Sequence, residues 1–576
     1  MDVLKHFPRG LPSNQNGGFP DAAWCAPDKL LLSEKWQMRP GAVLVGRLMP
    51  MSPESKAHFD IDDGAYAPIA IQDDRHMMTV AGSRSGKGRS VIVPNMCLYP
   101  GSVIAIDPKG DLATITAARR GRGSETAVAM NTRVFVLDPF ETVRGNAKDY
   151  LASFNPLDMI DPDGLYGRDD AALLADALII PSQSDSHWTD AAKMLLTGLI
   201  LHVCASANGE MRNLINVRAA LTADEDGFAD ILAEMSLSDT AGGVVARSAN
   251  SLLAMSDKER SSVLSTAIVQ TDFLDSPAMQ NVLARSDFTL SSLKDTPTTV
   301  YLSLPAGRIG THSRWLRLMI ALAIEAMERN RMRPRHPVLF LMDEFHALGP
   351  MKTIERAAGL IAGFGVRLWP ILQDLTQLKR DYKDSWETFL GNAGLTQWFG
   401  VNDLTTLEYL SKRLGQTTLN VDNQGEISKA QAMNGFTGRS VSRQIVELMT
   451  PEEIGRYFSR QSGRQLVLWP GSDPIAIARL NYDESPALTG KFDPDPNYCS
   501  TAASEEFGES SSPDPRPRSR NRSRNVRPAD GRVQSESETR HAGAPVEANR
   551  CRRRREPSLH GVSATLQKAT GMGERT

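Results

Sequence analysis

The residues best suited to chemistry form a glycine-rich stretch, Ala81–Gly88, which reads AGSRSGKG. Glycines and other small residues let backbone N–H groups turn inward around a phosphate group. A short apolar run precedes the stretch, and the positive end of a helix expected after it would face the same anion. Lys87 can reach the β- and γ-phosphates as a mobile point charge. We therefore predict that a nucleotide binds at Gly82, Ser83, Arg84, Ser85, Gly86, Lys87, Gly88 and Arg89.

Two positions of this stretch depart from the usual phosphate-loop pattern GxxxxGK[ST]. Ala81 stands where the first glycine is usual, and Gly88 stands where a Ser or Thr normally holds Mg²⁺. The hydroxyl ligand of Mg²⁺ must then come from elsewhere, for instance from Ser90 or from water. The sequence SGKG could also be an ordinary surface turn, so the stretch alone leaves both interpretations open.

The second candidate is a pair of carboxylates in the segment HPVLFLMDEFHALG. A buried strand that ends in Asp343-Glu344 places both carboxylates at the carboxyl edge of a sheet, beside the phosphate loop. There Asp343 would hold Mg²⁺ through water, and Glu344 would polarise the attacking water. Alone, the segment could be a strand that ends in a solvated acidic turn. Together with the glycine-rich stretch, it predicts hydrolysis of ATP with Mg²⁺.

A third apolar run, Val366–Leu372, ends in Gln373-Asp374. A glutamine at such a strand end could touch the γ-phosphate or orient water, and so report which nucleotide is bound. The alternative is a polar strand terminus without a catalytic role. The predicted catalytic residues are therefore Lys87, Glu344 and Gln373, and the predicted metal-side residue is Asp343.

These groups need a sheet to position them, and the order of apolar runs predicts a parallel one. Short β-branched runs alternate with longer helical stretches, which is typical of a doubly wound α/β domain. Several runs are apolar on both faces, as a buried parallel sheet requires. The expected strands are Ala42–Gly46, Met78–Val80, Val103–Ile106, Val134–Leu137, Val300–Leu304, Val338–Met342 and Leu368–Leu372.

Strand signals are almost absent between residues 165 and 296, where apolar residues recur at helical spacing and Ser256–Glu259 forms a capping-box pattern. We interpret this stretch as an all-helical insertion, with a set of ordinary crossover helices as the alternative. The predicted divisions are a loop-rich segment at 1–70, two parts of a nucleotide-binding domain at 71–164 and 297–484, the insertion at 165–296, and an Arg-, Ser- and Pro-rich tail at 485–576. Because that tail has few apolar residues, we expect it to be disordered.

Composition restricts the surroundings of the chain. The formal net charge is -3, so contact with nucleic acid must come from a local basic surface. The 5 cysteines form neither a CxxC pair nor a Cys/His cluster, which argues against structural zinc and suits a reducing compartment. No apolar run resembles a signal peptide or approaches the roughly 18 to 20 residues that span a bilayer. We therefore expect a cytoplasmic protein without a transmembrane segment in this chain.

With these segments in hand, the chain resembles the TraG-type coupling proteins of conjugative type IV secretion over about residues 65 to 480. The similar blocks include the glycine after Lys87 and, in chain order, AGSRSGKGRSVIVPN, GSVIAIDPKGD, SFNPLDMI, LMDEFHALG, RLWPILQDLTQL and LMTPEEI. The resemblance implies a RecA-like P-loop motor domain with an inserted all-α domain. It also implies ATP hydrolysis with Mg²⁺ by a homo-hexameric ring that drives DNA translocation.

The resemblance further implies partners: single- or double-stranded DNA, a relaxase, and channel components at the inner membrane. Most members of the family begin with a membrane anchor of two helices, so we expect this chain to act as a variant without an anchor, peripheral at that membrane. A ring ATPase also needs an arginine that acts in trans. Arg356 and Arg367 lie near the metal-side strand, but either could be a structural ion-pairing residue, and neither is assigned.

The basic run Arg329–His336 could contact DNA, although a solvated helix end is the simpler interpretation. The basic run Arg552–Arg555 in the tail could bind nucleic acid, acidic lipid or acidic partner proteins, with a solvated extension as the alternative. Three functions remain open from the sequence. The first is a DNA-translocating ATPase. The second is a recruitment platform for secreted proteins that uses ATP mainly for assembly. The third is a small-molecule kinase or nucleotide switch, which is the weakest because nothing in it requires a ring.

Overall fold

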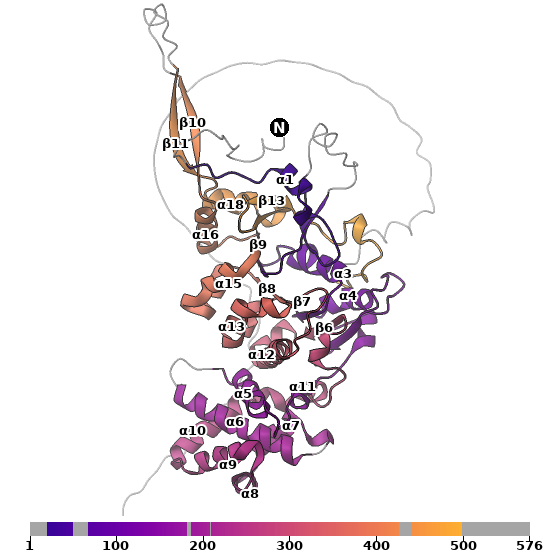
Figure 1. Cartoon of the computed structure of the whole chain (residues 1–576), viewed down its shortest axis with the longest axis vertical. Coiled ribbons are helices and arrows are strands. Elements are labelled where there is room, and N and C mark those ends of the chain that lie inside the picture. The colour runs from indigo at the N-terminus through magenta and orange to yellow at the C-terminus, as the bar shows by residue number, and fades with distance from the viewer. Residues whose placement is uncertain (1–19, 50–66, 181–185, 208, 425–438, 498–576) are drawn as a thin grey trace, which may run out of the picture. The chain divides into compact units, whose positions relative to one another are not determined.

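The computed structural model describes residues 20–49, 67–180, 186–207, 209–424 and 439–497 (Figure 1). These residues all belong to the first of two units into which the chain divides, Met1–Ser500. Within them, eleven strands form one sheet in the order β2-β1-β13-β12-β9-β3-β8-β7-β4-β6-β5. The strands of this sheet are β1 (Val43–Arg47), β2 (Pro68–Ile71), β3 (His76–Ala81), β4 (Val103–Asp107), β5 (Arg133–Leu137), β6 (Thr298–Ser303), β7 (Val338–Met342), β8 (Val366–Leu372), β9 (Ala393–Phe399), β12 (Arg464–Leu468) and β13 (Ile475–Ala478).

The strands from β9 to β5 in that order pair in parallel, and β12, β13, β1 and β2 extend the sheet by antiparallel pairing. The predicted α/β fold with a mainly parallel sheet is therefore confirmed. Each predicted strand is present within two residues of its expected bounds. Six strands were not predicted: β2, β9, β12 and β13 of this sheet, and two strands of a separate hairpin, β10 (Gln416–Gln424) and β11 (Arg439–Glu447).

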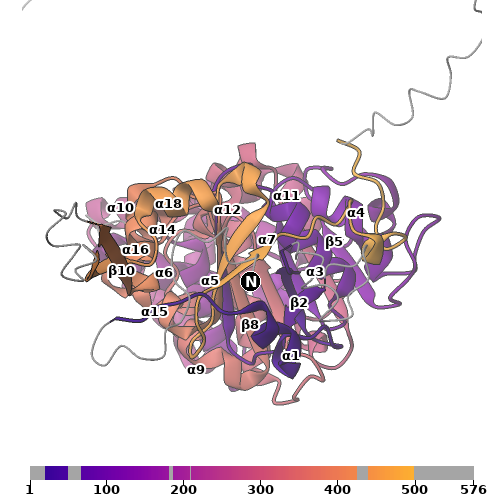
Figure 2. The ribbon, with the colours of Figure 1, turned by 90° about the horizontal axis from the view of Figure 1, so that it is seen from above.

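The central strands are buried on both faces, as their continuous apolar sequence requires. In β7, for example, Leu339 and Leu341 belong to one hydrophobic core, and Phe340 and Met342 belong to the other. Helices α3 (Val93–Leu98) and α4 (Asp111–Arg120) contribute to the first core. The second core contains side chains of α12 (Ala306–Arg329), α13 (Lys352–Leu360), α14 (Leu375–Tyr382), α15 (Trp386–Asn392), α16 (Leu404–Leu414) and α18 (Pro451–Tyr457), and Figure 2 shows helices around the strands seen from above.

Between β5 and β6, the described part of the chain contains helices and loops but no strand, apart from an isolated bridge of Leu151 to Val136. The helices are α5 (Gly167–Leu178), α6 (Ser186–Ser206), α7 (Leu214–Leu221), α8 (Glu225–Ser236), α9 (Thr240–Leu253), α10 (Asp257–Gln270) and α11 (Pro277–Leu283). The predicted capping box is confirmed at the start of α10, where the Ser256 side chain accepts from the Glu259 N–H and Glu259 accepts from the Ser256 N–H. The treatment of residues 165–296 as a separate inserted domain stays a prediction.

The described part of the loop-rich segment 1–70 contains a short helix, α1 (Pro27–Leu32), the predicted strand β1 and the first residues of β2, and both strands belong to the main sheet. The start of the disordered tail at 485 needs correction. Residues 485–497 are packed: Leu488 is buried, and Asp493 accepts hydrogen bonds from Ser124 and Thr126. The rest of the tail, including Arg552–Arg555, lies outside the described residues.

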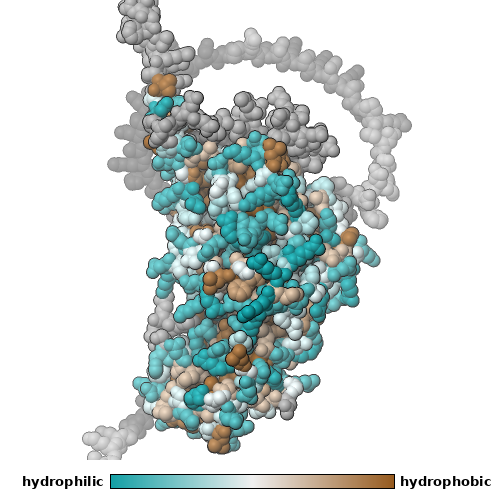
Figure 3. All heavy atoms as spheres, viewed as in Figure 1, coloured by the Kyte–Doolittle hydropathy of each residue, from teal (hydrophilic) through white to brown (hydrophobic). Residues whose placement is uncertain are grey.

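A hairpin of β10 (Gln416–Gln424) and β11 (Arg439–Glu447) stands apart from the main sheet and projects from it in Figure 1. On the face of the molecule drawn in Figure 3, hydrophilic residues dominate and hydrophobic ones are scattered. No helix in the described ranges combines the length and apolarity needed to span a membrane.

Candidate nucleotide-binding site

The glycine-rich stretch forms a loop between β3 and a helical turn of π type, Gly88–Ile92, which continues into α3. Gly86 lies in the left-handed region at φ 90°, where a glycine is unstrained. A Cβ atom on Gly82 would lie 2.0 Å from the Gly400 carbonyl oxygen, so no other residue fits there. Arg84 also has a left-handed φ, of 54°, and its side chain is exposed. The loop therefore has the tight backbone curvature that a phosphate cradle needs.

Since Gly88 has no hydroxyl group, the one that normally follows the lysine of a phosphate loop has to come from elsewhere, for instance from a nearby serine. A Cβ on Gly88 would meet no atom within 4 Å, so packing does not demand glycine at this position. The Ser90 hydroxyl is buried and donates to the Gly86 carbonyl at 2.9 Å, which turns it away from the cradle. The Ser85 hydroxyl is buried with no hydrogen-bond partner within the described structure. Ser85 is therefore a buried serine of the cradle whose hydroxyl is unused.

Lys87 and the two carboxylates meet although 256 residues separate Lys87 from Asp343 in the chain. The Lys87 ammonium lies 3.0 Å from a carboxylate oxygen of Asp343 and 2.7 Å from one of Glu344. The sheet order explains the contact, because β8 alone separates β3 from β7 and all three strands end at the same edge. Oxygen donors at this edge are of the kind that Mg²⁺ prefers, and the cradle is of the kind that phosphates occupy.

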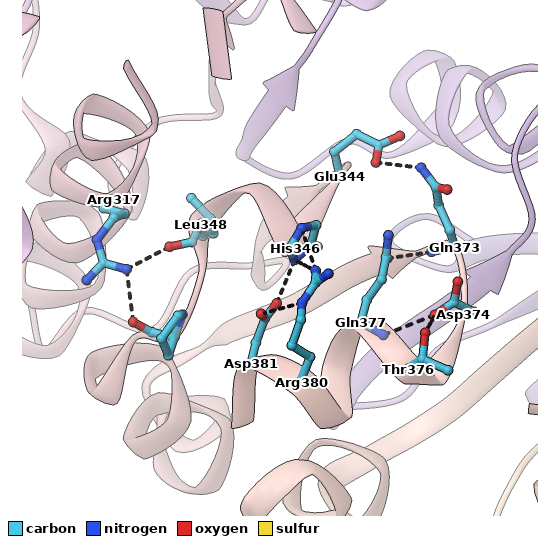
Figure 4. A network of polar contacts seen from close by, with 11 residues as sticks. Arg317, Glu344, His346, Leu348, Gln373, Asp374, Thr376, Gln377, Arg380 and Asp381 are labelled. Carbon is cyan, nitrogen blue, oxygen red and sulfur yellow. Dashed lines mark hydrogen bonds and ion pairs between the residues drawn. The ribbon is translucent and has the colours of Figure 1, made fainter. Parts of the chain in front are cut away.

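The structure also brings Gln373 to this group, because β8 ends between β3 and β7. Its side-chain amide donates to Glu344 at 3.0 Å, and Figure 4 shows the two side chains pointing toward one another. Glu344 has φ 51° and ψ 45°, a left-handed conformation that costs a non-glycine residue about 1 to 3 kcal/mol. The fold thus holds Glu344 in a strained backbone conformation that directs its carboxylate toward Lys87 and Gln373.

The pKa values of these groups follow from burial and mutual attraction. Burial acts to lower the pKa of Lys87, but Asp343 and Glu344 outweigh it and raise the pKa. Burial raises the pKa of Asp343 above its usual value, although Lys87 opposes this effect. Burial also acts to raise the pKa of Glu344, but Lys87 and Gln373 outweigh it and lower the pKa. Glu344 is therefore the carboxylate better suited to be ionised and to accept a proton.

Two residues at the same sheet edge were not singled out from the sequence. Asp107 ends β4, accepts from the backbone N–H of Ala113 at 2.9 Å, and has its pKa raised to about 6 by burial. Lys109 follows it and contributes to the lowered pKa of Glu344. The signal was present in the segment AIDPKGD, another apolar strand that ends in charged residues at a turn.

The side chain of Arg89, which was predicted to contact nucleotide, is bound in this structure by the segment after β13. Its guanidinium donates to Asp483 at 2.7 Å and to Glu484 at 2.7 Å. Arg479, from the same segment, donates to the Ser85 carbonyl, and a Cβ on Gly86 would lie 3.5 Å from its guanidinium. The segment after β13 therefore stabilises the phosphate loop through hydrogen bonds with Arg89 and with the Ser85 carbonyl.

The two arginines considered for action in trans, Arg356 and Arg367, both interact with their own chain. Arg367 is 1% exposed within β8, so its side chain cannot reach another subunit. Arg356 pairs with Glu328 at 3.5 Å. Burial thus excludes Arg367 from a role in trans, whereas Arg356, whose side chain is 55% exposed, stays unassigned.

Beyond Glu344, polar contacts connect the metal-side turn to its surroundings (Figure 4). His346 contacts Asp381 of α14 at 2.7 Å and Arg380 at 2.6 Å. Arg317 of α12 is buried and donates to the carbonyls of Leu348 at 2.6 Å and Pro350 at 2.9 Å. These contacts fix the turn that carries the two carboxylates.

A lysine-bearing phosphate loop and an acidic strand end at one edge of a parallel sheet define a P-loop NTPase. The chain is similar in fold to the bacterial conjugative coupling protein TrwBdeltaN70 in its unbound form, with a TM-score of 0.54 and 14% identity, covering 79% of this chain and 98% of that one. A structure of TrwB with ADP and Mg²⁺ is similar at a TM-score of 0.51. The predicted RecA-like P-loop fold is thereby confirmed.

The model of the family "Type IV secretory system Conjugative DNA transfer" matches residues 28–506, and the chain belongs to this family. It is 27% identical over 467 residues to a conjugal transfer protein TraG of Escherichia coli, covering 77% of this chain and 70% of the relative. It is 26% identical over 504 residues to the type IV secretion system-coupling protein VirD4 of Bartonella henselae, covering 81% and 73%. The predicted family resemblance is confirmed.

Proposed function

We propose that this chain is an ATP-hydrolysing coupling protein that links a DNA–relaxase substrate to a type IV secretion channel and drives DNA translocation. The observation that supports hydrolysis best is the contact of Lys87 with both Asp343 and Glu344. The family name and the TraG and VirD4 relatives support the coupling role. From the coupling role of these relatives, we further propose that the chain acts as a homo-hexamer at the cytoplasmic face of the inner membrane.

The proposed chemistry uses the residues as they lie. ATP occupies the loop from Gly82 to Arg89, and Lys87 leaves the carboxylates to contact the β- and γ-phosphates. Asp343 would hold Mg²⁺ beside the phosphates, and the buried Ser85 hydroxyl is a further candidate donor. Mg²⁺ supplies neutralisation of the phosphate charge.

Glu344 is the proposed general base: Lys87 and Gln373 lower its pKa in the observed structure, and the Gln373 hydrogen bond still favours the ionised carboxylate after Lys87 has left. Freed from Lys87, its carboxylate accepts a proton from the attacking water, while Gln373 holds the second carboxylate oxygen. TrwB has been captured with a non-hydrolysable ATP analogue and with ADP and Mg²⁺, which supports the same cofactors here.

The test is Glu344→Gln, which keeps the size of the side chain and removes the base. We expect ATP binding to persist and turnover to fall about 100-fold or more. Phosphate release and fluorescent-nucleotide binding measure the two effects, with and without single- and double-stranded DNA. Exposed Glu408→Gln on α16 is the matched control.

Normal turnover in Glu344→Gln would refute the assigned base. Turnover that does not respond to either form of DNA would count against translocation. Substrate export that continues in a Glu344→Gln strain would favour the recruitment platform, in which ATP serves assembly.

A further inference from the structure

The loop Asn330–Pro337 joins α12 to β7 and carries three exposed arginines, Arg331, Arg333 and Arg335. It lies at the amino edge of the parallel strands, because β7 begins directly after it. The nucleotide site lies at the carboxyl edge. Five residues of β7 separate the two edges, which corresponds to about 16 Å along the strand.

Three segments pack closely against the inner side of this loop, and each has a glycine at the point of contact. A Cβ on Gly365 would lie 2.7 Å from the Pro334 ring, and one on Gly41 would lie 2.2 Å from the His336 ring. A Cβ on Gly101 would lie 2.9 Å from the His336 Cβ. Because Pro334 and His336 face inward at these contacts, the arginines that alternate with them face outward.

The charge of the three arginines is not balanced locally. None of them forms an ion pair within the part of the chain that the structure describes. The acidic residues nearest in sequence are already engaged: Glu325 pairs with Arg329 at 2.8 Å, and Glu328 pairs with Arg356 at 3.5 Å. The loop therefore presents a fixed row of positive charge to an external anion.

Apolar side chains accompany this charge. Met332 is 55% exposed and Phe364, which precedes Gly365, is 40% exposed. Proteins that bind single strands combine a positive track for the phosphates with aromatic side chains on which bases stack. In an extended chain, every second residue is about 6.6 Å further on, so successive guanidinium groups can meet successive phosphates.

We propose that Arg331, Arg333 and Arg335, together with Phe364, form a contact site for single-stranded DNA. The proposal rests on the DNA-translocating function proposed above and adds the surface that holds the strand. The three guanidinium groups contact phosphates, and the Phe364 ring stacks on a base. Such a site binds without sequence preference and weakens with salt.

The experiment uses the full chain and a fluorescent oligothymidylate, with binding measured by anisotropy from low to high salt. For R331Q/R333Q/R335Q we expect up to about 50-fold weaker binding at 0.15 M salt, and a salt slope that is smaller by about 2. The charge-matched control R168Q/R260Q/R285Q alters arginines of the helical region and should bind as the wild type does. Phe364→Ala should weaken binding about fivefold or more and leave the salt slope unchanged.

Equal affinity and slope in the wild type and the arginine variant would overturn the proposal. So would a loss of DNA-free turnover with unchanged DNA affinity, which indicates that the loop serves a neighbouring subunit's nucleotide. Weaker binding of an acidic protein partner with unchanged DNA binding would overturn it as well. Failure of the DNA function is distinguishable, because the wild type would then bind no oligothymidylate at any salt.

Discussion

The hydrogen bond from Gln373 to Glu344 lets Gln373 influence how well Glu344 acts as a base. It favours the ionised carboxylate, so it lowers the pKa of Glu344 and fixes one of its oxygens. Gln373 does not exchange protons itself. In the proposed mechanism it is therefore a positioning residue for the base and a sensor of the γ-phosphate.

We expect Gln373→Ala to lower kcat about 10- to 100-fold and to leave the KM for ATP nearly unchanged. Without the amide, the pKa of Glu344 rises, so the acid limb of the pH–rate profile should move to higher pH. Steady-state kinetics between pH 5 and 9 would measure both effects. Thr376→Ala, on the following turn, is the control, and an unshifted acid limb would contradict the assignment.

At the scale of elements, α12 is the helix that connects the metal-side turn to the helical region. Arg317, on its buried face, donates to the carbonyls of Leu348 and Pro350 after β7 and to that of Ala177 at 3.2 Å in α5. Burial lowers the pKa of Arg317 to about 10, so the guanidinium remains charged at neutral pH. The Arg317 side chain thus connects α12, α5 and the turn after β7 that carries Asp343 and Glu344.

Replacing Arg317 with Met keeps an unbranched side chain but leaves three carbonyls without their donor, two of them in buried hydrogen bonds. We expect the free energy of unfolding to fall by about 3 kcal/mol. Urea denaturation would measure it, with exposed Arg308→Met on the same helix as the control. An unchanged urea midpoint would show that other donors or water satisfy these carbonyls.

At the scale of the whole molecule, the proposed ring determines how activity depends on neighbouring subunits. If hydrolysis is coordinated around a ring, an inactive subunit impairs active ones. An equal mixture of wild type and Lys87→Ala should then have clearly less than half the turnover of the wild type at the same total concentration.

Phosphate release, measured after the subunits have exchanged, would test this expectation. A titration across mixing ratios distinguishes a curved fall from a linear one. A strictly linear fall, together with a monomer in sedimentation, would contradict the ring and leave the chemistry of the site intact.

The sequence by itself determined the local features of this protein. The glycine-rich loop, the acidic end of β7, the end of β8 and the capping box of α10 are each encoded within a few consecutive residues. Turns, caps and buried strands depend on nearest neighbours, so short patterns suffice to predict them.

Only the tertiary structure decided which segments lie together. The position of β8 between β3 and β7, the hold of residues 479–484 on Arg89 and Ser85, and the burial of Arg367 depend on contacts between distant parts of the chain. The amino-terminal β1 and the late β13 are neighbours for the same reason. Short apolar runs of similar composition carry little information about their partners, because pairing energy is nearly the same for many arrangements until the whole sheet and its helices pack.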